Sequence, residues 1–184
     1  MDGIWVKGDV MSEIGTTVIA DMKRDRETAR EYLLFYDIRL TEYNRKKADE
    51  LSSQPRPDNP QGGGNNGVGN PTESQALRIV RYDESHPEYY WLKAVEILQR
   101  SLGERKNIFI KVRREAEVKK VSGVGRPAWV VYTQMHYMRE LEDRFLNGAV
   151  SISENYVRNL WRELVNQTVE IYLRLKNNIR YNEY

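Results

Sequence analysis

The chain of 184 residues has 40% hydrophobic and 30% charged residues, which suffices for one core or for two small helical units joined by a linker. It contains no cysteine, which excludes disulfides, thiol catalysis and the usual zinc modules, and no apolar run of about 18 residues, which excludes a transmembrane helix. The net charge of +2 is uneven: residues 1–102 carry 14 Lys and Arg against 17 Asp and Glu, and residues 103–184 carry 15 against 10, so a phosphate-facing surface is expected in the second part.

The first segment, residues 1–51, is expected to end in a long helix. Residues 1–20 have no basic region followed by an apolar one, so we predict no signal peptide and expect a cytoplasmic protein. Residues 21–51 predict one long helix, because apolar positions recur every three or four residues and share one face. These positions are Ala29, Leu33, Tyr36, Leu40 and Tyr43.

Residues 52–71 predict a flexible linker. Four prolines and five glycines in this stretch exclude a continuous helix or a central strand. A Gly-rich loop that holds phosphate needs a following Lys-Ser or Lys-Thr and a preceding apolar strand. The stretch has neither, which favours a connector.

Residues 72–102 predict a second helical region made of two helices. Ser85 and Glu88 have the spacing of a capping box, and Pro87 suits the first turn of a helix and would break a continuous one. We therefore expect a new helix over about 87–102.

Residues 103–184 are predicted to form the functional unit of the chain. A basic helix is expected over 104–120, with Ile108, Phe109 and Val112 as its buried stripe. The basic stretch 105–126 is expected to supply most of the affinity for a polyanion.

A helix-turn-helix is predicted next. Gly148 follows a predicted helix over about 128–147 and is a typical stop residue. Four further residues lead to Ser153, which suits the N-cap of the next helix. Two helices joined by a few residues that include glycine form a helix-turn-helix, with residues 153–165 as the recognition helix. Its predicted inner face consists of Val157, Leu160, Trp161, Leu164 and Val165.

The polar residues of this unit are candidate DNA contacts. Side chains early in a recognition helix reach base edges, and Asn and Arg suit bidentate contacts with adenine and guanine. Phosphates would be held by Lys119, Arg126, Arg158 and Arg162, and bases would be read by Asn155, Asn159 and Arg158. The candidate set is Lys119, Arg126, Ser153, Asn155, Tyr156, Arg158, Asn159 and Arg162.

The sequence also resembles a family. The run Gly-Val-Gly-Asn-Pro-Thr-Glu-Ser-Gln-Ala-Leu at residues 67–77, after a long helix and before the Ser153-Glu154 helix start with Val157, is similar to phage and prophage late transcription regulators of the ArpU and RinA type. The resemblance implies a transcription regulator with a C-terminal helix-turn-helix like region 4 of sigma-70 factors. It also implies a phage or prophage origin and a place in the host-cell cytoplasm.

Other functions compete with this interpretation. The small terminase subunit, a DNA-binding protein of phage packaging, and a helical protein-interaction module without DNA stay open as alternatives. The only two histidines, His86 and His136, lie fifty residues apart, and no nucleophile or carboxylate pair stands out. We therefore predict no enzyme, no cofactor and no metal. Duplex DNA is the expected partner, RNA polymerase and a homo-oligomer are further candidates, and no membrane association is expected.

Overall fold

The computed structural model describes residues 7–53, 71–121, 129–145 and 151–182, which form seven helices and no strand. The helices are α1 (Lys7–Leu34), α2 (Tyr36–Ser53), α3 (Pro71–Ser85), α4 (Pro87–Ser101), α5 (Glu104–Val121), α6 (Trp129–Phe145) and α7 (Glu154–Asn182). The predicted all-α class is confirmed. None of the described helices combines the length and the apolar character needed to cross a bilayer.

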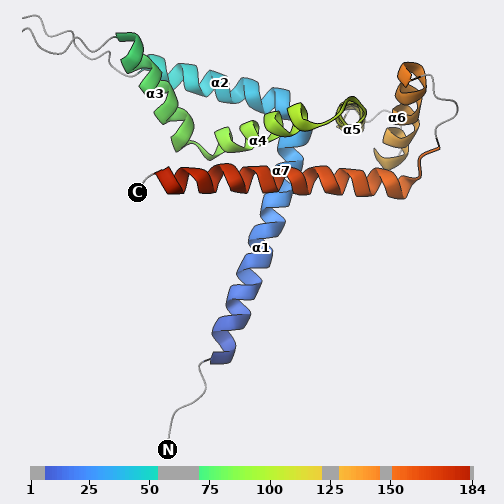
Figure 1. Ribbon diagram of the computed structural model, residues 1–184, viewed down its shortest axis with the longest axis horizontal. Coiled ribbons are helices and arrows are strands. Elements are labelled where there is room, and N and C mark those ends of the chain that lie inside the picture. The colour runs from blue at the N-terminus through green and yellow to red at the C-terminus, as the bar shows by residue number, and fades with distance from the viewer. Residues whose placement is uncertain (1–6, 54–70, 122–128, 146–150, 183–184) are drawn as a thin grey trace, which may run out of the picture.

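Helix α7 is the longest element and organises the others. It runs as one rod along the molecule, and α1 crosses it steeply, with the first turns of α1 projecting away from the other helices (Figure 1). Helix α7 packs against α4, α1 and α6, and α5 packs against α6. The N-terminal part of α7 therefore meets α6, while its C-terminal part lies on α1 and α4.

One hydrophobic core connects the described helices, because each of them contributes at least one buried apolar side chain. The C-terminal half of α7 joins this core through Tyr172, whose ring stacks on Trp91 of α4 at 3.7 Å and 6°. Tyr32 of α1 stacks on the same Trp91 at 6.1 Å. The part of α7 beyond the predicted recognition segment thus packs on α1 and α4.

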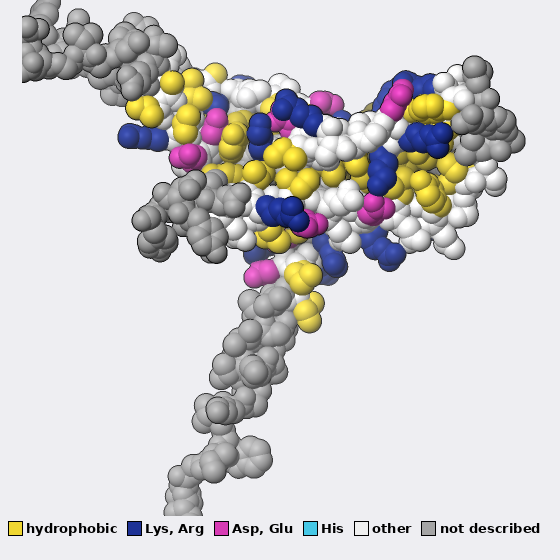
Figure 2. All heavy atoms as spheres, in the orientation of Figure 1, with side chains coloured by type: hydrophobic (Ala, Val, Ile, Leu, Met, Phe, Trp, Pro, Cys, Tyr) yellow, Lys and Arg dark blue, Asp and Glu magenta, His cyan; other side chains and the backbone are white. Residues whose placement is uncertain are grey.

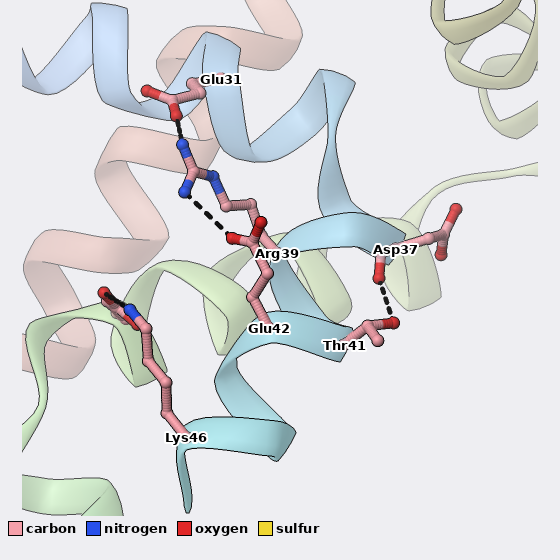
Figure 3. A network of polar contacts seen from close by, with 7 residues as sticks. Glu31, Asp37, Arg39, Thr41, Glu42 and Lys46 are labelled. Carbon is pink, nitrogen blue, oxygen red and sulfur yellow. Dashed lines mark hydrogen bonds and ion pairs between the residues drawn. The ribbon is translucent and has the colours of Figure 1, made fainter.

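The prediction of one long helix over residues 21–51 is wrong. The chain instead forms two helices with a bend at Phe35 between them: α1 ends at Leu34 and α2 begins at Tyr36. Helix α1 already begins at Lys7. Arg39 of α2 bridges the bend, because its guanidinium pairs with Glu31 of α1 and, at 3.2 Å, with Glu42 of α2 (Figure 3). The bend turns α2 back to pack against α4.

Helices α2, α3 and α4 meet through polar contacts around Asp83. The Tyr43 hydroxyl donates to Asp83 Oδ1 at 2.5 Å, and Lys47 Nζ pairs with the same oxygen at 2.5 Å. Lys46 of α2 pairs with Glu88 of α4 at 3.1 Å (Figure 3). These contacts hold α2 against the α3–α4 corner.

The predicted capping box at the start of α4 is wrong. His86 is the N-cap and makes no capping hydrogen bond with its side chain. The Ser85 hydroxyl instead donates to the Tyr82 carbonyl at 2.9 Å, and Glu88 pairs with Lys46. Pro87 does stand at the first position of α4 as expected.

The predicted linker is described only at its ends. Helix α2 runs to Ser53 and α3 begins at Pro71, so both ends of the predicted stretch 52–71 belong to helices. Residues 54–70 lie outside the described residues, as do residues 148–150 of the predicted turn 148–152.

Candidate nucleic-acid interface

The start of α7 is capped and its inner face is buried, both as predicted. The backbone N–H of Tyr156 donates to Ser153 Oγ at 3.2 Å, which satisfies one of the free donors in the first helical turn. The predicted inner face is buried throughout, at Val157, Leu160, Trp161, Leu164 and Val165. Residues on the other side of this part of α7 therefore face outward.

Four candidate side chains share the outward face of α7. Asn155, Arg158, Asn159 and Arg162 are all exposed. Arg158 pairs with Glu154 at 3.2 Å, and Arg162 Nη2 donates to Asn159 Oδ1 at 2.8 Å. Exposed pairs of this kind contribute about 0.3–0.5 kcal/mol, so a phosphate or base edge can replace the carboxylate or amide partner at small cost.

Tyr156 points toward α6. It is 47% exposed and interacts with Tyr137 of α6, which is almost fully buried. Burial, followed by the effect of Tyr156 as a neighbour, raises the pKa of Tyr137 to about 12. Tyr156 therefore links the start of α7 to α6 and exposes only part of its ring.

The remaining candidates do not share this helix face. Lys119 is exposed on α5, and its Nζ lies 4.7 Å from the ring centre of Tyr132 on α6. Arg126 lies outside the described residues. Figure 2 shows Lys and Arg side chains spread over the visible face, with hydrophobic and acidic side chains between them. Charge is thus distributed over this face and forms no single continuous patch there.

The basic helix α5 differs from its expected role as a phosphate-binding surface, because Arg113 is buried and Arg114 is half-buried against the α1–α2 bend. Arg113 is 5% exposed, pairs with Glu117 at 2.9 Å and lies over the rings of Trp129 and Trp161 at 4.3 Å and 5.2 Å. Burial lowers the pKa of its guanidinium. Arg113 is therefore a packing residue between α5, α6 and α7.

Arg114 is the second inward-facing arginine of α5. Its Nε donates to the Leu33 carbonyl near the end of α1 at 2.7 Å, and its guanidinium lies 5.6 Å from the Tyr36 ring and 3.8 Å from Asp37. Burial lowers its pKa. A cation at a helix C-terminus satisfies free carbonyls and interacts well with the helix dipole, so Arg114 stabilises the α1–α2 bend.

The sequence did carry a signal that α5 is packed on several sides. Ile108, Phe109 and Ile110 are consecutive and all at most 4% exposed. Three successive apolar residues cover most of the circumference of a helix, which is typical of a helix packed on several sides. Only two of the three belong to the predicted stripe.

A pocket beside α5 lies away from the α7 candidates. It has a volume of about 580 Å³ and mixed polar and apolar walls. Its lining consists of Asp37, Gln99, Asn107, Ile110, Lys111, Arg114, Glu115, Val118 and Lys119. Among the described residues, no group of three or more His, Asp or Glu side chains has the arrangement of a metal site. The pocket therefore shares only Lys119 with the candidate interface.

The structure thus brings Asn155, Arg158, Asn159 and Arg162 together on one exposed face and keeps Lys119 on a neighbouring helix. Comparison with known protein families, with curated proteins and with solved structures finds no match for this chain.

Proposed function

We propose that this protein binds duplex DNA, with α6 and the first half of α7 as the two helices of a helix-turn-helix. The observation that carries the proposal is the start of α7. There a capped helix end presents Asn155, Arg158, Asn159 and Arg162 on one side, and the other side is buried. Recognition helices present their N-terminal residues to the major groove in this way.

Binding would use the four exposed side chains of α7, together with Lys119 of α5, in two roles. Asn155 and Asn159 suit bidentate contacts with adenine, and Arg158 suits guanine or a phosphate. Arg162 and Lys119 would hold phosphates. Lys119, Arg158 and Arg162 are the described candidates for phosphate contacts. If these three cations contact phosphates, the logarithm of the binding constant should fall with the logarithm of the salt concentration with a slope of roughly −3.

The biological setting follows from the family resemblance at residues 67–77 and around Ser153. It supports a regulator of transcription encoded by a phage or prophage and acting in the host cytoplasm. RNA polymerase is then a candidate partner. The binding itself involves no chemical step, so the proposal invokes no catalytic residue and no cofactor.

Selection from a randomised duplex library tests the proposal, because it examines binding and reports the preferred site together. The full chain should enrich one sequence, and the variant Arg158→Ala with Arg162→Ala should lose that enrichment. The matched control is Arg100→Ala with Arg174→Ala, which removes two arginines that are each 74% exposed and paired with a glutamate. Enrichment of the same sequence by the Arg158/Arg162 variant would refute α7 as the recognition helix.

Protein interaction is the second candidate function, and exposed apolar side chains favour it. Leu77 and Val80 lie three residues apart on α3 and are 52% and 47% exposed, and Ile19 and Met22 on α1 are 70% and 50% exposed. Light scattering after size exclusion separates the options. A ring oligomer would favour the small terminase subunit, and a monomer that shifts no DNA at low salt would favour an interaction module.

A further inference from the structure

Three helices meet around one buried cation. The Arg113 guanidinium of α5 lies over Trp129, the first residue of α6, and over Trp161, in the second turn of α7. The exposed fractions of its side chain and of that of its ion-pair partner Glu117 are 6% and 14%. A single side chain therefore contacts both helices of the proposed helix-turn-helix.

The stability of the fold does not explain this arrangement well. Arg113 Nε is buried without a hydrogen-bond partner among the described residues. A buried ion pair usually stabilises a protein no more than apolar residues of the same volume would, because both charges lose their hydration. The planar guanidinium does provide a defined geometry, since it stacks on aromatic faces in a fixed orientation.

We propose that Arg113 is a positioning residue, whose stacking between Trp129 and Trp161 sets the orientation of α6 relative to α7. The inference rests on the proposed DNA binding in one respect only. A fixed orientation of the two helices would place Asn155 and Arg158 against base edges while α6 crosses the phosphate backbone of the DNA. The orientation itself is a property of the free protein and can be measured without DNA.

The test variant combines Arg113→Met with Glu117→Gln, which removes both charges and keeps similar side-chain volumes. Because the chain has no cysteine, spin labels can be placed specifically at Met135 of α6, which is 64% exposed, and at Asn166 of α7, which is exposed. Each is replaced by cysteine in the otherwise unchanged full chain. The control variant is Glu170→Gln with Arg174→Met, the same chemical change in an exposed pair of α7.

Pulsed electron paramagnetic resonance then gives the distance distribution between α6 and α7. We expect a narrow distribution in the parent and the control, and a broader or shifted one in the Arg113/Glu117 variant, with helical content unchanged. An unchanged distribution in a folded variant would overturn the proposal. If that variant does not fold, Arg113→Lys decides: it keeps the charge for Glu117 and loses the planar group, so the distribution should again broaden, and an unchanged one again overturns the proposal.

DNA binding provides the second measurement. Affinity for the selected site should fall about tenfold in the Arg113/Glu117 variant, a size typical of residues that act through others, and affinity for unrelated duplex should stay the same. Equal losses on both duplexes would contradict a role in site reading. If the parent chain selects no site, the proposed function fails, while the spin-label distances still decide whether Arg113 orients the helices.

Discussion

Helix α5 and the first half of α7 carry the same residue types and use them in opposite ways. Arg113 and Arg114 of α5 are turned into the interior, where they contact tryptophan rings, a carboxylate and a backbone carbonyl. Arg158 and Arg162 of α7 are exposed, and each pairs with a neighbour on its own helix. An arginine is thus available for contacts outside the fold only where the helix face it occupies is exposed.

The comparison also separates two consequences of substitution. A change at an inward arginine should cost stability, because it disturbs groups that have left water. A change at an outward arginine should cost binding and leave stability nearly untouched. Measurements of unfolding and of binding on the same variants therefore test the comparison directly.

The largest effect is expected from Arg113→Met alone. It removes the buried ion pair with Glu117 and the guanidinium that packs on Trp129 and Trp161, so the free energy of unfolding should fall by about 3 kcal/mol. Arg158→Met, at a side chain that is 54% exposed, should change it by less than about 0.5 kcal/mol. Denaturant unfolding of both variants measures this difference, and equal effects would erase the distinction between the two helices.

A pH effect is expected from Tyr137, on the buried side of the contact with Tyr156. Its pKa is raised from 10.0 to about 12 in the folded chain, mainly by burial. The unfolded chain therefore loses the Tyr137 hydroxyl proton at a lower pH than the folded chain does. The contribution of the protonated hydroxyl to the free energy of unfolding is complete below about pH 10. It is lost, by roughly 3 kcal/mol, as the pH rises through about 12.

The free energy of unfolding should fall less steeply over this pH range for Tyr137→Phe than for the parent chain. Some decline should persist, because burial also raises the pKa of Tyr32 to about 12. Identical declines in the two proteins would show that the Tyr137 hydroxyl titrates alike in both states.

Arg114→Met sharpens the comparison at the α1–α2 bend. It removes the donor to the Leu33 carbonyl and the partial pairing with Asp37, so stability should fall by about 2 kcal/mol, as expected for a hydrogen bond to a charged group. The control Lys111→Met removes a cation of the same helix that is 56% exposed. If both changes cost the same, Arg114 has no special role at the bend.

The smallest effect is expected at the cap of α7. Ser153→Ala removes the acceptor of the Tyr156 N–H, which should cost about 1 kcal/mol. Ser153→Asp restores an acceptor and should recover most of the loss, and Ser151→Ala, at an exposed neighbour, should be silent. Thermal unfolding of the three variants measures the series, and a silent Ser153→Ala would exclude the cap.

The helix starts and the buried face that the sequence predicted correctly in α4 and α7 come from clear end signals and a single apolar stripe. Pro87 marks the start of α4 and Ser153 precedes α7, and the stripe from Val157 to Val165 is buried as expected. In α7 the local preferences and the packing agree, so the pattern alone suffices.

The bend at Phe35 and the burial of Arg113 could not be predicted in the same way. The apolar spacing from Ala29 to Tyr43 continues through the bend, because both helices bury the corresponding face, and neither Pro nor Gly marks the break. Arg113 is buried because Trp129 and Trp161 lie 16 and 48 positions further along the chain and approach it only in the fold. Contacts of this range leave no local periodicity.

The continuity of α7 has a mechanical consequence. Its 29 residues form one helix with a rise of about 1.5 Å per residue, so the rod is roughly 40 Å long. One end carries the outward row from Asn155 to Arg162, and Tyr172 in the second half of the rod stacks on Trp91. Because the helix is continuous, a small tilt at Tyr172 displaces the outward row, so the packing of α7 on α1 and α4 and the orientation of the row are coupled.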